Sequence, residues 1–259
     1  MSIDCCPGRR EDIPALRRLW KEAFGDTDAF LDLFFGTAFA PTRCRVAREG
    51  DEIQAALYWF DCQCGGQPMV YIYGVATAKA ARGRGMATAL MKNAQAHLES
   101  QNIRGMILVP GTAALVRFYE PMGFGLCAPQ GRMRVDAAGP AIPLKPVNPR
   151  RYGELRGKLL PGGGVVQEGV SLDFLAAQMK LYAGKDILLA AAIQEDGSLY
   201  ACELLSPDPV AMAPRILKAL RIPTGLFRVP YPKGRPFAMF KPLPGWQGAA
   251  PTYFAFAFD

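Results

Sequence analysis

The residues whose types and spacing could do chemistry are concentrated in one glycine-rich stretch of the first half. It follows an apolar segment that ends with Val75, Ala76 and Thr77, and it leads into a helical pattern. The stretch consists of Arg82, Gly83, Arg84, Gly85, Met86 and Ala87. Glycine lets the backbone approach a ligand closely, and the first N–H groups of a helix are unpaired and partly positive. Such a helix start binds phosphate, and the two arginines would add positive charge.

Taken alone, this stretch allows two interpretations. It matches neither G-x-G-x-x-G nor G-x-x-x-x-G-K-[ST], the patterns of dinucleotide and nucleotide sites. A glycine-rich turn before a helix is also an ordinary strand-to-helix connection. The residues by themselves favour a phosphate-binding loop and a plain connection equally.

Two motifs together resemble the GNAT superfamily of N-acetyltransferases. The first lies in residues 73–90 and contains the loop pattern [QR]-x-x-G-x-[GA]. Its defined positions are filled by Arg82, Gly85 and Ala87. The second, residues 113–124, ends Y-x-x-x-G-F, with Tyr119 as its tyrosine. The order and separation are those of the family, and the resemblance covers residues 2–135, about half of the chain.

The resemblance implies a GNAT fold of the α/β (α+β) class, a mixed and mostly antiparallel sheet flanked by helices. It implies acetyl-CoA as cofactor, with the pantetheine arm between a bulged fourth strand and the next strand. Backbone N–H groups near Val75 and Thr77 would hold the arm and polarise the thioester carbonyl, and the loop would take the diphosphate. The expected cofactor contacts are Val75, Ala76, Thr77, Arg82, Gly83, Arg84, Gly85, Met86, Ala87 and Thr112.

The resemblance also implies a catalytic acid, with three departures nearby. Tyr119 matches the tyrosine that protonates the departing thiolate; the alternative is a buried aromatic residue. Thr112 stands where many members carry asparagine, so it is either a cofactor contact or a helix N-cap. Pro121 should end its helix early. The fourth strand offers no glutamate as a general base.

A base is needed because an amine of pKa about 10 must lose a proton before it attacks. The candidates are Glu22, Asp28, Asp32 and Asp61, although each is expected to be a surface carboxylate or a cap. The chain ends with Asp259, and the resemblance to the enhanced-intracellular-survival type implies that its carboxylates could reach the thioester. The alternative is an edge strand with a solvated end. His97 is interpreted as structural.

The elements that must position these residues follow from periodicity and turn signals. Asp12, Asp28 and Thr112 are the expected helix caps. The first half is predicted to contain helices over 13–24 and 28–39, strands over 44–48, 53–62 and 68–77, a helix to about residue 98, a strand over 107–109, a helix over 113–120 and a strand over 124–130. The second half is predicted to contain a helix over 174–182, strands over 187–193 and 199–205, a helix over 210–220, and strands near 226, near 237 and over 253–258.

This order predicts three parts. Residues 1–137 form the acetyl-CoA-binding catalytic domain, 138–149 a proline-rich linker, and 150–259 a degenerate GNAT-like domain that completes the acceptor pocket. The second half lacks a phosphate loop, so we expect no second cofactor there. The aromatic residues Phe30, Phe34 and Phe35 are expected to line the acceptor pocket or to belong to the core.

Composition limits the remaining possibilities. The net charge is +7, and beyond residue 130 there are 16 basic against 10 acidic residues, without a basic run, so nucleic-acid binding is not expected. No apolar run is long enough to cross a membrane, and no export signal is visible. Seven cysteines with one histidine favour reduced thiols in a cytoplasmic protein over a metal site.

The sequence therefore predicts an N-acetyltransferase. Acetyl would pass directly from acetyl-CoA to a primary amine of a small molecule or peptide in a ternary complex. The alternative is a non-catalytic acyl-CoA-binding sensor or scaffold. The oligomeric state stays open, with a dimer among the possibilities.

Overall fold

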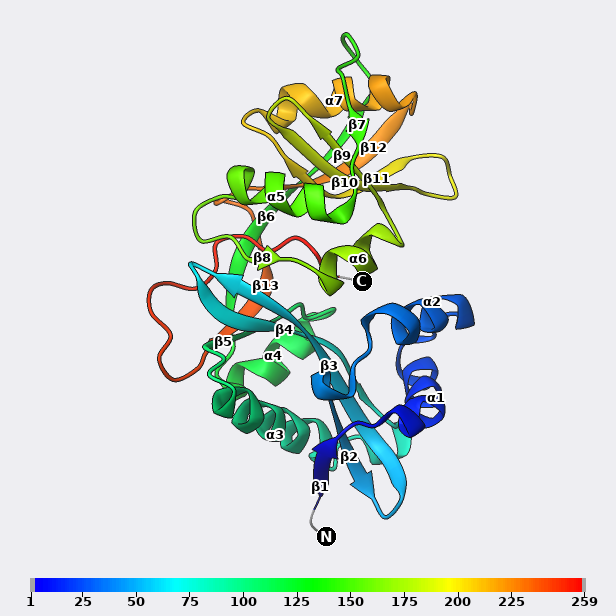
Figure 1. Ribbon diagram of the computed structural model, residues 1–259, viewed down its shortest axis with the longest axis vertical. Coiled ribbons are helices and arrows are strands. Elements are labelled where there is room, and N and C mark those ends of the chain that lie inside the picture. The colour runs from blue at the N-terminus through cyan, green and yellow to red at the C-terminus, as the bar shows by residue number, and fades with distance from the viewer. Residues whose placement is uncertain (1–2, 258–259) are drawn as a thin grey trace.

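The structure is a computed structural model that describes residues 3–257 (Figure 1). The first half contains β1 (Asp4–Pro7), α1 (Ile13–Phe24), α2 (Asp28–Leu33), β2 (Cys44–Glu49), β3 (Glu52–Cys64), β4 (Gln67–Thr77), α3 (Met86–Ser100), β5 (Gly105–Leu108), α4 (Ala113–Tyr119) and β6 (Gly125–Asp136). The second half contains β7 (Lys145–Pro146), α5 (Pro149–Leu159), β8 (Val166–Gln167), α6 (Val170–Ala176), β9 (Lys180–Gly184), β10 (Ile187–Ile193), β11 (Leu199–Leu205), α7 (Pro209–Leu220), β12 (Thr224–Pro230) and β13 (Arg235–Pro242).

One sheet runs through both halves. Its strand order is β1-β2-β3-β4-β5-β13-β6-β12-β11-β10-β9-β7, with β8 paired to β3. Most neighbours are antiparallel, while β4–β5 and β11–β12 are parallel. With helices on its faces, this is the predicted α/β architecture, a mixed and mostly antiparallel sheet.

The long strand β6 joins the two halves. Its first part pairs with β13, from Arg235 opposite Gln130 to Phe240 opposite Gly125, and its second part pairs with β12. Strand β13 therefore lies between β5 and β6, although it comes from the end of the chain. This pairing joins residues on either side of the predicted boundaries at 137 and 150, and the division into a catalytic domain, a linker and a second domain stays a prediction.

Alternating side chains bury both faces of the sheet in the first half. On one face Val46, Tyr58 and Phe60 pack against α1 and α2; on the other Leu57 and Trp59 pack against α3 and α4. Figure 1 shows the two pairs of helices on opposite sides of the strands. The period of two along β3 explains this arrangement, because successive side chains point to opposite faces.

Several local predictions need correction. Helix α5 and strand β1 were not predicted, and the segment predicted as a helix over 174–182 is instead the end of α6, a turn and β9. Asp12 does not cap α1; its carboxylate accepts from the Arg9 N–H and pairs with Arg48 at 2.7 Å. The cap of α2 is Thr27, whose hydroxyl accepts from the Phe30 N–H, so Asp28 is the first helical residue.

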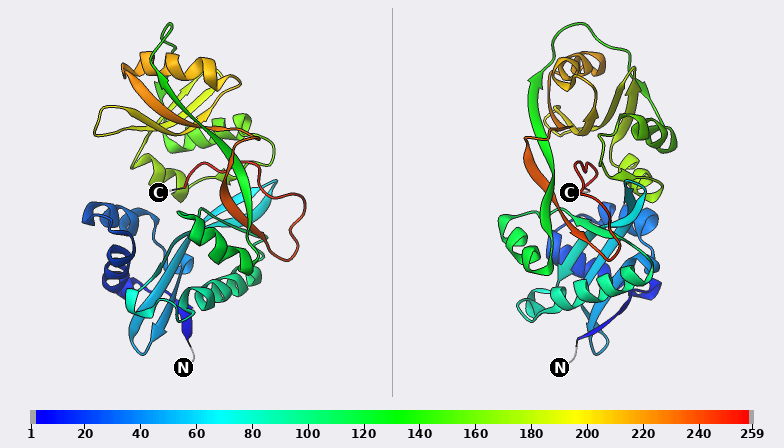
Figure 2. Two further views of the ribbon diagram at one scale, coloured as in Figure 1. Left: turned by 180° about the vertical axis from the view of Figure 1, so that it is seen from behind. Right: turned by 90° about the vertical axis from the view of Figure 1, so that its left-hand side faces the viewer.

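The segment before the chain end was predicted as a strand, which is wrong over 253–257 apart from one bridge at Tyr253. It is buried rather than an exposed edge. The Gln130 amide donates to the Phe254 carbonyl, and Gln167 exchanges two hydrogen bonds with the backbone of Phe256. In both views of Figure 2 this red segment lies between the two halves.

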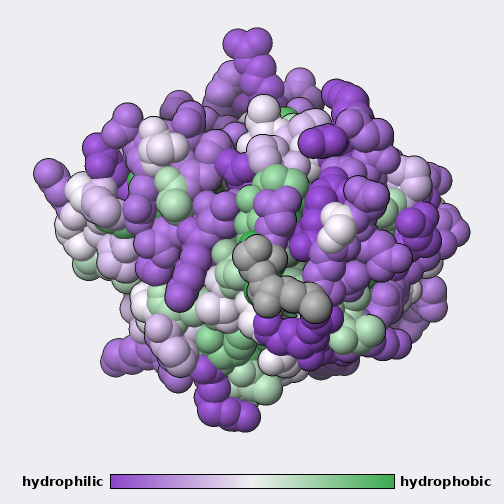
Figure 3. All heavy atoms as spheres, turned by 90° about the horizontal axis from the view of Figure 1, so that it is seen from below, coloured by the Kyte–Doolittle hydropathy of each residue, from purple (hydrophilic) through white to green (hydrophobic). Residues whose placement is uncertain are grey.

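No helix within residues 3–257 is long and apolar enough to span a membrane. The face drawn in Figure 3 is mainly hydrophilic, with hydrophobic atoms in small scattered areas. Over the same residues, no group of three or more histidine, cysteine or acidic side chains comes together as in a metal site.

Candidate active site

A bulge in β4 shapes the centre of the candidate site. Ala76 faces Ala56 on β3, but Tyr73 faces Tyr58, so β4 carries an extra residue between them. Gly74 lies in this bulge with φ +58°, and a Cβ there would approach the Trp20 ring to 2.8 Å. Only glycine satisfies both conditions, because other residues are strained at positive φ and would clash with the indole. The sequence signal was a glycine inside a β-branched and aromatic strand.

Beyond the bulge, β4 separates from its parallel neighbour. The β4–β5 pairing covers Met69, Val70 and Tyr71, opposite residues 105–107, whereas β4 continues to Thr77. The segment that contains Val75, Ala76 and Thr77 therefore has no strand beside it on the β5 side in the described ladder. Unpaired backbone groups along a strand edge can pair with an extended ligand.

The glycine-rich loop joins this open edge to α3. Gly83 and Gly85 adopt φ values of +75° and +79°, and a Cβ at either position would meet nothing within 4 Å. The backbone conformation, not lack of space, therefore requires glycine there. Gly85 is the N-cap of α3, and no side chain caps the helix. The first N–H groups of α3, near Met86 and Ala87, are left for a ligand.

Tyr119 ends α4 and is 5% exposed. Its ring contacts Phe118 and Phe124, with centroid distances of 5.0 and 5.7 Å. Burial raises the pKa of its hydroxyl to about 12, so the phenol is protonated at neutral pH. A short 3-10 turn containing Pro121 follows at once, and the helix ends early as predicted.

The sequence and the fold agree with known proteins. The profile of the acetyltransferase (GNAT) domain matches residues 7–127. That span contains the bulge, the open strand edge, the loop and Tyr119. The chain contains a GNAT acetyltransferase domain.

Solved structures extend the likeness of fold beyond the GNAT domain. A GCN5-related N-acetyltransferase from Anabaena variabilis ATCC 29413 aligns with a TM-score of 0.73 at 18% identity, over 92% of this chain and 72% of that one. Eis1 from Mycobacterium abscessus gives 0.64 at 14%, over 91% and 66%. A GCN5-related N-acetyltransferase from Sphaerobacter thermophilus gives 0.56 at 12%, over 97% and 98%. No curated protein matches the sequence.

Acetyltransferases of this family use acetyl-CoA, and the residues of the GNAT domain fit it. The open edge of β4 suits an extended pantetheine arm, which carries amide groups that pair with backbone. The uncapped start of α3 suits a diphosphate. When bound, the cofactor supplies an acetyl group activated as a thioester.

The loop arginines differ in their surroundings. Arg84 pairs with Glu49 on β2, so its charge is already partly neutralised. The Arg82 Nε donates to the Thr77 carbonyl at 3.3 Å, and its side chain has no ion-pair partner among residues 3–257. Arg82 is therefore the freer cation of the two beside the loop.

Thr112 acts as a helix cap in the GNAT domain. Its hydroxyl accepts from the Leu115 N–H at 3.3 Å at the start of α4. This satisfies an otherwise unpaired donor. Its expected contact with the cofactor stays a prediction.

The four carboxylates considered as a general base that lie within the described residues are all engaged in other contacts. Asp28 pairs with Lys21 and Arg17, which hold its pKa below the usual value, and Asp32 pairs with Arg17. Asp61 lies 3.4 Å from Arg43. Glu22 accepts from the Lys79 N–H at 2.6 Å. These contacts fit structural roles on the surface.

Aromatic side chains from both halves meet beside the bulge. Trp20 contacts Phe34 and Tyr73, with centroid distances of 4.7 and 5.5 Å, and Phe30 and Phe34 reach Phe174 on α6 at 6.0 and 5.8 Å. Phe34 is buried, whereas Phe30 and Phe35 are half-buried. The helices expected to form the acceptor pocket thus contact the second half directly.

The predicted C-terminal base, Asp259, lies outside the described residues. The segment up to Ala257 leads between the halves, and Phe254 contacts Tyr71 on β4 at a centroid distance of 4.9 Å. The hydrogen bonds from Gln130 and Gln167 that hold this segment were not anticipated. Isolated glutamines carry no periodic signal by which they could have been found.

Proposed function

We propose that this protein transfers the acetyl group of acetyl-CoA to a primary amine by direct attack in a ternary complex. The observation that carries the proposal is the open edge of β4 running into an uncapped, glycine-formed start of α3. The cofactor contacts would be those predicted: Val75 to Thr77, the loop from Arg82 to Ala87, and Thr112.

The following residues would carry out the steps of the transfer. Backbone N–H groups beside the bulge in β4 hold the carbonyl oxygen and stabilise negative charge on it. Tyr119 keeps a proton at Oη, because burial raises its pKa to about 12, and donates it to the departing sulfur. The amine lies between the first two helices and the second half, where the aromatic side chains favour an amphipathic acceptor.

A carboxylate at the chain end would take the proton from the amine. The course of residues 253–257 between the halves supports Asp259 in this role. Removing Asp259 should lower turnover while cofactor affinity stays the same. Unchanged turnover would eliminate this assignment.

Turnover of acetyl-CoA with a panel of primary amines tests the proposed function, with free thiol as the readout. We expect thiol release with at least one amine, and Tyr119→Phe should lower kcat by about a hundredfold. Tyr231→Phe, at a half-exposed tyrosine of the second half, is the matched control. If the protein binds acetyl-CoA but releases no thiol with any amine, and Tyr119→Phe changes nothing, the sensor function would replace this proposal.

A further inference from the structure

A cavity lies on the side of β3 opposite the aromatic side chains of Trp20, Phe34 and Phe174. Its volume is about 470 Å³, and its lining comes from the start of β2, from β3 and from the C-terminal end of α3. Apolar side chains form much of the wall: Pro7, Pro41, Trp59, Leu98 and Ile103. The size and the mixed lining are those of a small-molecule site, and the proposed acetyl transfer uses none of these residues.

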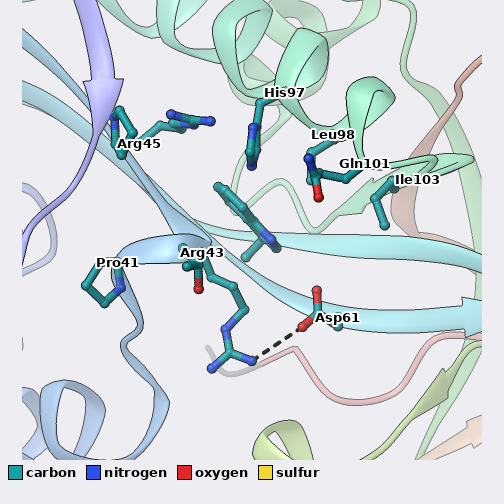
Figure 4. Close-up of a pocket in the computed structure, with 11 residues that line it drawn as sticks. Pro41, Arg43, Arg45, Asp61, His97, Leu98, Gln101 and Ile103 are labelled. Carbon is teal, nitrogen blue, oxygen red and sulfur yellow. Dashed lines mark hydrogen bonds and ion pairs between the residues drawn. The ribbon is translucent and has the colours of Figure 1, made fainter.

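Arg45 is the unusual residue of this cavity. It occupies a position of β2 that faces α3, where Ala47 and Leu57 on the same face are apolar core residues. Arg45 is only 8% exposed, and its Nε has no hydrogen-bond partner. Figure 4 shows its guanidinium extending toward His97. Within residues 3–257 no carboxylate pairs with it.

An unpaired buried cation is costly, so a compensating anion is expected. The C-terminal end of α3 offers only about half an elementary charge. The cavity's one carboxylate, Asp61, is bound to Arg43 (Figure 4), so it does not neutralise Arg45. The net effect is one uncompensated positive charge at the buried Arg45 and one ion pair at the exposed Asp61.

The other polar groups define what kind of anion fits. His97 lies 6.0 Å from the Trp59 ring, measured between centroids, and both burial and Arg45 lower its pKa. A neutral imidazole and the Gln101 amide can donate hydrogen bonds but add no charge. Arg45 is the single unpaired cation among the described residues that line the cavity, and the exposed Asp61 repels further negative charge, so the cavity suits a monoanion.

We propose that this cavity binds a small organic monocarboxylate with an apolar or aromatic body. Its carboxylate pairs with Arg45 and accepts from His97 or Gln101, and its body lies against Trp59, Leu98 and Ile103. The planar guanidinium fork matches a carboxylate in two-point contact. The site is independent of the acetyl-transfer proposal.

His97 is the only histidine of the chain, so its imidazole resonances report on this cavity without assignment ambiguity. The experiment titrates the full chain with benzoate and follows the His97 NMR signals, with benzamide as the uncharged control. We expect saturable binding of benzoate and a rise in the His97 pKa, because the carboxylate offsets the charge of Arg45. Besides His97, the charged groups lining the cavity are Arg43, Arg45 and Asp61.

Variants test whether benzoate binding depends on Arg45. Arg45→Met should weaken benzoate at least about tenfold and leave acetyl-CoA affinity unchanged, whereas Arg43→Met, at the paired arginine, should change benzoate affinity much less. Replacing a buried unpaired charge with an apolar side chain should also preserve folding, which circular dichroism checks. Equal binding of benzoate and benzamide, unchanged affinity in Arg45→Met, or tighter binding of phenyl phosphate would overturn the proposal. Self-association that depends on Arg45 would assign the cavity to a second copy instead and would also overturn it.

Discussion

The two halves of the molecule contain the same strand-helix-strand unit, but the two units differ at the start of the helix and in the residues buried beside the strands. In the first, β4 and β5 are parallel and joined through α3; in the second, β11 and β12 are parallel and joined through α7. Both pairings cover three residues, and in both halves the strand before the helix carries an irregularity in its pairing. Shared topology therefore does not distinguish the half that is proposed to bind the cofactor from the other half.

The starts of the two helices do distinguish them. Gly85 begins α3 without any side-chain cap, whereas the Asp208 carboxylate accepts from the Ala211 N–H at the start of α7. Pro209 then takes the first helical position, where it removes one further donor. The start of α3 therefore leaves backbone donors for an anion, whereas at the start of α7 the Asp208 carboxylate takes this position.

The second half also has a buried ion pair next to β11, the strand that precedes α7. Glu203 on β11 is fully buried and pairs with Arg156 of α5 at 2.9 Å, and it accepts from the Tyr152 hydroxyl. Arg156 also lies 4.5 Å from the centre of the Phe256 ring, so this network supports the segment near the chain end. The second half thus contains a buried polar network that connects α5, β11 and the segment near the chain end.

The largest effect is expected from breaking this network. Glu203→Leu leaves the Arg156 charge buried without a partner, which should lower the free energy of unfolding by about 3–5 kcal/mol. Urea denaturation measures the loss. The double variant with Arg156→Met should recover most of it and keep acetyl-CoA affinity, because the network is structural. A loss below about 1 kcal/mol in the single variant would show that the buried pair does not stabilise the fold.

The next largest effect is expected when a carboxylate cap like that of α7 is introduced at the start of α3. Gly85→Asp should weaken acetyl-CoA by about a hundredfold, because the carboxylate takes the α3 donors and repels the diphosphate. Gly85→Asn is the matched control, since asparagine tolerates the same left-handed backbone without charge. Isothermal titration measures both. Equal losses for Asp and Asn would mean that backbone strain, rather than charge, decides binding.

The reverse change should have a smaller effect. Asp208→Ala removes the cap of α7 and should cost about 1 kcal/mol of stability. It should leave acetyl-CoA stoichiometry at one per chain, because the second half has no glycine loop to complete a site. Thermal denaturation and titration test these two expectations. Binding of a second acetyl-CoA would contradict the contrast between the halves.

The smallest effect concerns the two loop arginines. Arg84→Gln should change acetyl-CoA affinity less than about threefold, because Glu49 already pairs with this exposed side chain. Arg82→Gln should weaken it more, since Arg82 has no such partner. Titrations at low and high salt should show the difference shrinking as screening increases. A larger effect at Arg84 would show that the ion pair opens when the cofactor binds.

Local signals in the sequence were sufficient for the antiparallel meander of the first half. The turns at residues 49–51 and 64–66 and the alternation along β3 and β4 predicted the meander, because each depends on neighbours in the chain. Prediction failed for α5, where arginines and glycines hide the helical period. It also failed at Asp12, whose carboxylate is drawn to Arg48 from a distant strand instead of capping the next helix.

By itself the sequence determined the glycine-rich loop and the start of α3, since glycine spacing and the helix that follows are properties of a few consecutive residues. Only the tertiary structure decided that β13 lies between β5 and β6 and that the alternating apolar segment near the chain end is buried between the halves. It also decided that Arg45 faces a cavity with no carboxylate partner within residues 3–257. These features depend on which distant segments meet. A period of two along a strand says which residues share a face, but it does not say what that face will contact.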